Sequence, residues 1–284
     1  MKQLKDELIL YIMPSPGINW SSPAALTLTT ALMKLTNRSR AIGHVTVKVN
    51  SSFNPSESFH TGMTQLDRNE GKKETLLKGY GFGILFYSFK GKLESAKELD
   101  PEVLERCKNG NISFVRFEVN SDVSKRLIKF FKEYQLKGAG NFYGSPHRPR
   151  YAEGGGCGPF AESVVELAGL LSEELNRSWI RRVRLPLKLI GGPKTGKKVH
   201  FLKMLFHFSW AKKTEPGYDF SICDPDLMHQ WVLKKIEDLE KNPDPQYAIE
   251  AMGKAKGIVM HAQNQGCPSD PIFKGQPDPS RLLI

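Results

Sequence analysis

Hydrophobic and polar positions in the first part of the chain fall into short strand-like and helix-like runs. A continuous apolar run at 7–13 predicts a buried first strand. Residues 22–35 follow, with a serine cap and a proline at the first helical position, and predict a helix. At 43–49 apolar and polar residues alternate strictly, which predicts a strand. Its polar face begins with His44 directly after a glycine, so we expect this histidine at a sheet edge or cleft mouth.

The middle of the chain continues the alternation of strands and helices. Extended segments are predicted at 57–65, 80–89 and 112–119, a short helix after Asp100, and a longer helix over 121–135 that Ser121 caps. Glycines at 79, 81 and 83 indicate a bend or a close approach of another chain segment in the second extended run.

A glycine-rich stretch then delivers one cysteine to the start of a helix. Residues 153–160 read Glu-Gly-Gly-Gly-Cys-Gly-Pro-Phe, and apolar residues recur at helical spacing from there to Leu175. Pro159 suits a first helical turn, so Cys157 falls at or near the N-cap. The unpaired amides and the helix dipole favour the thiolate there, and we expect the four glycines to leave backbone amides bare for an oxyanion. The alternative is a small, inert cysteine that packs the start of a core helix.

The last third combines a basic hairpin, helices and a tail. Hairpin strands are predicted near 180–190 and 198–208, a helix from the Cys223–Pro225 turn to about Lys241, another helix near 245–255, and an extended proline-rich tail from Cys267. We expect His207, which stands among Phe206, Phe208 and Trp210, to lie in the core. Any domain boundary lies near 176–182. It would separate a part spanning 1–176 from a basic hairpin with helices spanning 177–284, and the two parts could pack as one unit.

Composition adds bounds on the class of protein. The chain has 284 residues and 39% hydrophobic residues, enough for a sizeable core. No run reaches the roughly 20 apolar residues that a membrane span needs. The N-terminus lacks the order of a signal peptide, so we expect a cytoplasmic protein unless a leader has been removed. The four cysteines lie far apart; disulfides are possible, but the spacing favours free thiols.

The net charge of +11 is concentrated in one segment. Between 177 and 213 there is no Asp or Glu, while the basic residues are Arg177, Arg181, Arg182, Arg184, Lys188, Lys194, Lys197, Lys198, Lys203, Lys212 and Lys213. A face of one sign attracts phosphates, anionic lipid or an acidic polymer. A solvated hairpin without a partner is equally compatible with this pattern.

Two motif-like segments do not carry their usual chemistry. Residues 191–198 have the spacing of a phosphate-binding loop, but Lys198 stands where Ser or Thr should hold the metal, and a strand-like run follows, so we expect a hairpin turn. His200, His207 and Cys223 lack the closely spaced ligand pairs of a zinc site.

The order of elements around Cys157 resembles the circularly permuted branch of the papain-like superfamily, which contains permuted NlpC-type amidases and lecithin:retinol acyltransferase-like proteins. The match consists of Gly43-His44-Val45-Thr46-Val47 at the head of a strand, the strand and helix over 112–135, an Asn-Phe-Tyr segment at 141–143, and Cys157 opening the next helix. It covers roughly residues 7–176. The chain departs from the family in placing Gly156 before the cysteine, in its long loop between Tyr143 and Cys157, and in Lys48 on the histidine's face.

The resemblance implies a role for each matched residue. Cys157 would attack an acyl carbon, His44 would accept and return a proton, and His60 on the next strand would fix the imidazole tautomer, with Thr64 or Gln65 as alternatives. The Cys157 amide, with the Tyr143 hydroxyl, would hold the oxyanion. No metal or organic cofactor is implied.

These observations predict an α+β protein of permuted papain-like fold, with an antiparallel sheet packed against the cysteine helix and a basic hairpin and C-terminal helices appended. The expected function is a cysteine-dependent amide or ester hydrolase, such as a thiol protease, or an acyltransferase. Its substrate would be a peptide, a cell-wall fragment or a lipid. The alternative is a non-enzymatic protein that binds nucleic acid or anionic lipid with the basic face at 177–213.

Overall fold

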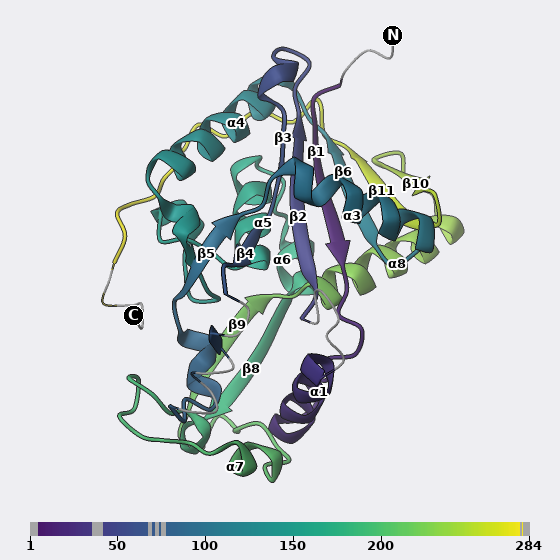
Figure 1. Cartoon of the computed structure of the whole chain (residues 1–284). Coiled ribbons are helices and arrows are strands. Elements are labelled where there is room, and N and C mark those ends of the chain that lie inside the picture. The colour runs from purple at the N-terminus through teal and green to yellow at the C-terminus, as the bar shows by residue number, and fades with distance from the viewer. Residues whose placement is uncertain are drawn as a thin grey trace.

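The computed structural model describes residues 5–35, 42–67, 70–71, 74, 78–278 and 280 and shows a mixed α+β protein (Figure 1). A six-stranded sheet has the order β10-β11-β6-β1-β2-β3, and smaller sheets are formed by β4-β5-β7 and β8-β9. The strands are β1 (Glu7–Met13), β2 (His44–Asn50), β3 (Phe59–Thr61), β4 (Met63–Gln65), β5 (Phe89–Leu93), β6 (Ser113–Glu118), β7 (Phe142–Tyr143), β8 (Ile180–Pro186), β9 (Gly217–Cys223), β10 (Tyr247–Met252) and β11 (Ala255–His261). The α-helices are α1 (Pro23–Leu35), α3 (Ala96–Asn109), α4 (Ser121–Leu136), α5 (Cys157–Leu167), α6 (Glu173–Trp179), α7 (Phe201–Leu205) and α8 (Pro225–Lys241).

The first strand lies in the middle of the main sheet, as its apolar run predicts. All seven residues of β1 are buried, and the strand pairs antiparallel with β2 on one side and β6 on the other. Leu8, Leu10 and Ile12 belong to a core shared with α4 and α5, while Ile9 and Tyr11 face a second core shared with α3. A strand buried on both faces reads as a continuous hydrophobic run.

The cysteine helix packs on β2 and is shorter than its pattern predicts. We expected one helix as far as Leu175, but α5 ends at Leu167 and α6 starts at Glu173. Gly169 adopts a left-handed φ of 74° between them, a conformation that glycine tolerates and that ends a helix. Ser172 then caps α6 by accepting a hydrogen bond from the Leu175 amide.

The C-terminal third differs most from the prediction. β8 pairs with β9, whereas the expected partner segment at 198–208 contains the short helix α7. The helix expected near 245–255 is wrong, because these residues form β10 and the start of β11. β11 runs parallel to β6, so this hairpin extends the same sheet that holds β1 and β2. The helix predicted after the Cys223–Pro225 turn is confirmed as α8.

The segment at 80–89 forms a 3₁₀ turn over Phe82–Phe86 instead of the expected strand, and a strand begins only with β5. Its glycines allow close approach, as expected. A side chain at Gly81 would lie 2.5 Å from the Leu189 carbonyl oxygen, and one at Gly83 would lie 2.1 Å from the Gly191 carbonyl oxygen. These contacts hold the segment against the chain that follows β8.

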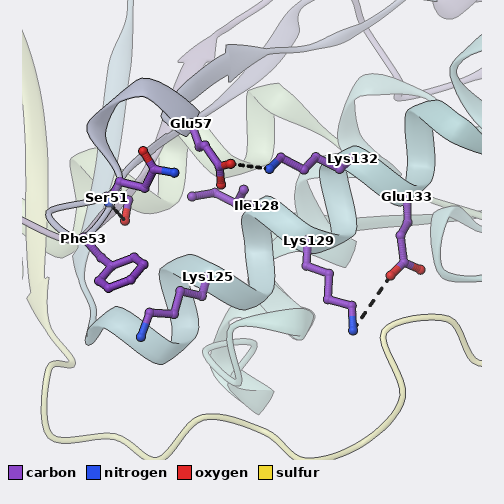
Figure 2. A pocket seen from close by; sticks show the side chains of 9 residues that line it. Ser51, Phe53, Glu57, Lys125, Ile128, Lys129, Lys132 and Glu133 are labelled. Carbon is purple, nitrogen blue, oxygen red and sulfur yellow. Dashed lines mark hydrogen bonds and ion pairs between the residues drawn. The ribbon is translucent and has the colours of Figure 1, made fainter.

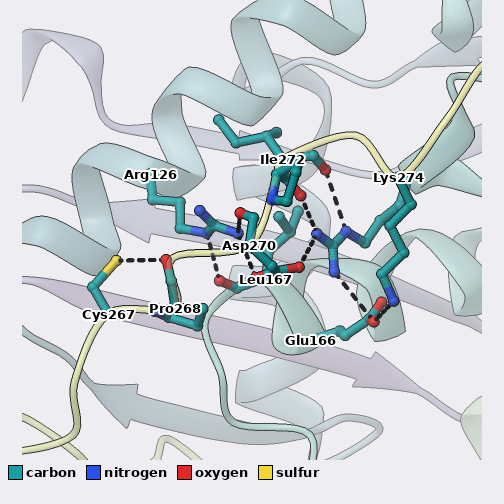
Figure 3. A network of polar contacts seen from close by, with 10 residues as sticks. Arg126, Glu166, Leu167, Cys267, Pro268, Asp270, Ile272 and Lys274 are labelled. Atoms are coloured by element: carbon teal, nitrogen blue, oxygen red, sulfur yellow. Dashed lines mark hydrogen bonds and ion pairs between the residues drawn. The ribbon is translucent and has the colours of Figure 1, made fainter.

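The C-terminal tail is extended, as predicted, and crosses α4 and α5 (Figure 3). Asp270 accepts from Arg126 of α4 at 2.9 Å and pairs with Arg150 at 2.6 Å. Further on, Lys274 pairs with Glu166 of α5. The tail therefore ties α4 and α5 to the loop that precedes Cys157. Among all helices that the structure describes, none has the length and apolar character to cross a bilayer.

Candidate active site

The structure brings Cys157 and His44 together across more than a hundred positions of sequence. His44 is the first residue of β2, Cys157 is the first residue of α5, and α5 packs on β2. The His44 imidazole lies close enough to the Cys157 thiol to lower its pKa. The imidazole is buried and the cysteine is half-buried. This is the nucleophile and base arrangement that the motif order predicts.

The surroundings of the sulfur favour its thiolate. Burial alone would raise the pKa of the Cys157 thiol, but the hydrogen bond and the charge of His44 outweigh it. The backbone groups of Val45 and Gly158 beside the sulfur lower the pKa further. The net result is a pKa below the ordinary thiol value, which is the property of a reactive cysteine.

Glu94 is the group that holds the His44 ring. The Nε2–H of His44 donates to Glu94 Oε2 at 2.6 Å, and the side chains are only 4% and 5% exposed. Because Nε2 is engaged in this way, Nδ1 is the ring nitrogen left for the sulfur. The backbone of Glu94 is tied in turn to the β3–β4 connection: its N–H donates to the Gly62 carbonyl, and its carbonyl accepts from the Thr61 hydroxyl.

The tautomer-fixing contact expected of His60 is therefore made by Glu94. His60 pairs with Lys48 in the β2–β3 register, four residues and about 13 Å along the strand from His44. Its Nδ1 donates to Asp100 at 2.8 Å and its Nε2 bonds the Thr46 hydroxyl at 2.8 Å, so both ring nitrogens are occupied. Burial lowers the pKa of His60 even with the Asp100 carboxylate beside it. His60 supports the strand rather than the ring of His44.

The other residues proposed for the site lie nearby but without a shown role. The alternatives for the tautomer-fixing residue, Thr64 and Gln65, pair with β5 through Lys92 and Gly91. Tyr143 lies in β7 and packs half-buried against the same core as Cys157. Its predicted contribution to an oxyanion hole stays a prediction.

The glycines around Cys157 have a different purpose from the one expected. A side chain at Gly154 would lie 2.2 Å from the Phe142 carbonyl oxygen, and one at Gly158 would lie 2.1 Å from the Cys223 carbonyl oxygen. Residues 153–156 and 158 are buried. The glycines therefore allow tight packing within the chain. The expectation of a bare amide is wrong for Gly155, whose N–H donates to the Phe142 carbonyl at 3.1 Å. The N–H of Cys157 itself, at the first position of α5, has no acceptor within the helix and is the better candidate for an oxyanion donor.

The remaining cysteines are free thiols, as expected, and lie in unreactive surroundings. Burial raises the pKa of Cys107 and of Cys267, and it raises the pKa of Cys223 well above the ordinary value. The Cys223 thiol contacts the Met228 sulfur at 3.6 Å. Within the described part of the chain, no cluster of three His, Cys, Asp or Glu side chains forms a metal site.

A groove of about 320 Å³ lies elsewhere, between α4 and the loop after β2 (Figure 2). Ser51, Phe53 and Lys129 are among the residues that line it. Ser51 follows the far end of β2 and lies seven positions along the chain from His44, a distance of about 23 Å in a strand. This groove is therefore not the substrate site of the Cys157–His44 pair.

We expect iodoacetamide, in limiting amount near neutral pH, to alkylate Cys157 before the other three cysteines. The reason is that its pKa lies below the ordinary value whereas theirs lie above it. In His44→Ala the sulfur of Cys157 stays buried but loses the imidazole beside it, so the pKa of the thiol should rise. Labelling of Cys157 at neutral pH should then slow by about tenfold or more. As the pH is lowered, the labelling rate of wild-type Cys157 should begin to fall only at pH values below the pKa of an ordinary thiol. His44→Ala should need a higher pH to reach the same labelling rate.

Peptide mapping by mass spectrometry measures this order of labelling. Cys267 is the internal control, because it is also half-buried and its rate should be the same in both proteins. Labelling of Cys267 or Cys107 ahead of Cys157 would contradict the account.

Glu94→Gln and His60→Gln should separate positioning of the catalytic base from support of the fold. Replacing Glu94 removes the carboxylate that orients His44 and should slow alkylation or turnover at Cys157 by about a hundredfold. Replacing His60 disturbs its two buried hydrogen bonds and should lower the free energy of unfolding by about 1–3 kcal/mol, with the rate per folded molecule largely kept. Denaturant unfolding and Cys157 reactivity, measured on both variants, test the assignment, which fails if the two effects are exchanged.

Gly62→Ala should impair the site more than the fold. An added methyl group would lie 3.0 Å from Glu94 Oε2 and 3.1 Å from His44 Nε2, so it would press on the hydrogen bond that joins them. A displacement of a few tenths of an ångström should reduce the rate at Cys157 by about tenfold. Gly266→Ala is the matched control, because nothing lies within 4 Å of a methyl group there. Equal rates of reaction at Cys157 in Gly62→Ala and Gly266→Ala would contradict this prediction, because the Glu94–His44 hydrogen bond would then tolerate the added methyl group.

Comparison of the chain with protein-family models, curated proteins and solved structures finds no match. The resemblance to permuted papain-like enzymes therefore stays a proposal, and the geometry of Cys157, His44 and Glu94 is what supports it.

Proposed function

We propose that this protein is a cysteine-dependent amide or ester hydrolase, or an acyltransferase, of the permuted papain-like type. The observation that carries the proposal is the buried chain of contacts from Cys157 to His44 to Glu94. A nucleophile, a base bonded to it and a third group that orients the base form the general pattern of covalent acyl transfer.

The first half of the reaction forms a thioester. The Cys157 thiolate attacks the acyl carbon, and the carbonyl oxygen develops negative charge that the N–H at the start of α5 is placed to stabilise. His44, held by Glu94, gives its proton to the leaving amine or alcohol as the bond to that group breaks. The acyl group is then bound to the sulfur.

The second half of the reaction releases the acyl group. A water molecule, an amine or an alcohol attacks the thioester through its oxygen or nitrogen. As it attacks, it gives a proton to His44. The carbon–sulfur bond breaks and Cys157 leaves as the thiolate. Water gives hydrolysis and another nucleophile gives acyl transfer, so the same residues serve both activities.

The chain order of the residues supports the permuted branch of the superfamily. His44 precedes Cys157, the histidine heads a strand, and the cysteine opens a helix that packs on that strand. Glu94 follows β5, after the strand that carries the histidine. The third residue is thus a carboxylate that directly follows a strand of the small β4-β5-β7 sheet, a position that the sequence pattern did not reveal.

An activated ester tests this function directly. With p-nitrophenyl acetate, we expect a burst of p-nitrophenolate equal to one acyl group per protein, followed by slower turnover. Intact-mass and peptide analysis of acid-quenched samples should place the acetyl group on Cys157. Cys157→Ala should abolish the burst, and His44→Ala should reduce its rate by roughly 10²–10⁴-fold.

Cys223→Ala is the matched control. It also removes a thiol that packs in the core, but burial makes the Cys223 thiol unreactive. A burst that survives in Cys157→Ala, or an acyl group found on another residue of the wild-type protein, would contradict the proposal.

A further inference from the structure

Large apolar side chains are exposed on α1 and on the segment around α7. These two helices lie at one end of the molecule (Figure 1). Phe206 and Phe208 are each 73% exposed, and His207 between them is only half-buried, so the core position predicted for His207 is wrong. We call the patch the apolar tip; it comprises Leu28, Leu32, Leu202, Phe206 and Phe208. Trp210 differs from them, because it stacks on Trp20 and donates its indole N–H to the Trp20 carbonyl.

Backbone contacts place the members of the apolar tip close together. The Ala24 N–H donates to the carbonyl of His207 at 2.9 Å, so the start of α1 meets the residue between the two phenylalanines. Leu28 follows Ala24 by one helical turn, and Leu32 follows by two. On the other segment, Leu202 and Phe206 are also one turn apart. Two exposed apolar rows therefore meet where α1 packs on α7.

Lysines surround the apolar tip. Burial lowers the pKa of His207, and the charges of Lys188 and Lys203 lower it further, so both lysines lie near the residue between the phenylalanines. Both are exposed, as are Lys212 and Lys213. Glu215 has the opposite effect and raises the pKa of His207. Its carboxylate accepts a hydrogen bond from the backbone N–H of Lys212. Exposed lysines therefore lie beside the patch.

We propose that the apolar tip docks on an anionic lipid bilayer, with the leucines and phenylalanines at the boundary between headgroups and acyl chains and the lysines on the anionic headgroups. Exposed apolar side chains within a cationic rim are the two features that interfacial binding uses. Single-stranded nucleic acid would also suit lysines and phenylalanines. Three of the five residues are leucines, however, and these bury well in hydrocarbon but offer no ring for a base to stack on.

Vesicle flotation of the full chain tests the proposal. We expect binding to mixed phosphatidylcholine–phosphatidylglycerol vesicles, weak binding to phosphatidylcholine alone, and weakening of binding as salt is raised. The double variant Phe206→Ser, Phe208→Ser should reduce partitioning by about tenfold or more, because it removes two rings from the docked face. Lys188→Glu, Lys203→Glu should weaken binding to the anionic vesicles specifically.

Matched controls come from the opposite part of the molecule. Phe53 is 71% exposed and lies beside Lys125 at the groove of Figure 2, so Phe53→Ser changes an equally exposed ring in another basic setting. It should bind vesicles like the wild type, as should Cys157→Ala, which separates this proposal from the proposed enzyme activity. The proposal is overturned if the apolar-tip double variant binds like Phe53→Ser. It is equally overturned if the wild type ignores anionic vesicles while binding single-stranded RNA.

Discussion

A single buried hydrogen bond, from His44 Nε2 to Glu94 Oε2, holds the candidate site in a reactive geometry. Both side chains are almost fully removed from water, where removing one partner would leave the other buried and unpaired at a large cost. The charge of the imidazole that Glu94 orients in turn favours a thiolate at Cys157. The strand carrying His44 and the helix carrying Cys157 bring the dyad together, but the residue after β5 sets which nitrogen faces the sulfur.

Much of this site could be predicted from the sequence because its parts are locally encoded. The alternation at 43–49 places His44 at the head of a strand, and the glycine–proline pattern around Cys157 places the thiol at the start of a helix. Glu94 could not be found in this way. It lies in a polar stretch between β5 and the serine cap of α3, and only the packing of β3 and β4 against it brings it to the histidine. The expected residue, His60, is on the neighbouring strand but four positions out of register.

Errors elsewhere follow the same division between local and long-range forces. Residues 245–255 are rich in helix-forming side chains, yet they form β10 and the start of β11, because β11 pairs with the distant strand β6. His207 looks like a core residue in the sequence because aromatic residues flank it, but Phe206 and Phe208 are exposed and Trp210 stacks on the half-buried Trp20. The glycines beside Cys157 signal close approach, and the sequence alone does not distinguish approach by a substrate from approach by the Phe142 and Cys223 carbonyls.

The central claim is that His44 and Glu94 keep Cys157 as a thiolate while the other thiols stay protonated. Ultraviolet absorbance of the thiolate, measured against pH as the difference between wild type and Cys157→Ser, reports on this sulfur without any substrate. The account predicts a transition below the pKa of an ordinary thiol in the wild type, with a shift to higher pH in both His44→Ala and Glu94→Gln. A wild-type transition at or above the ordinary thiol value, unmoved by either substitution, would contradict it.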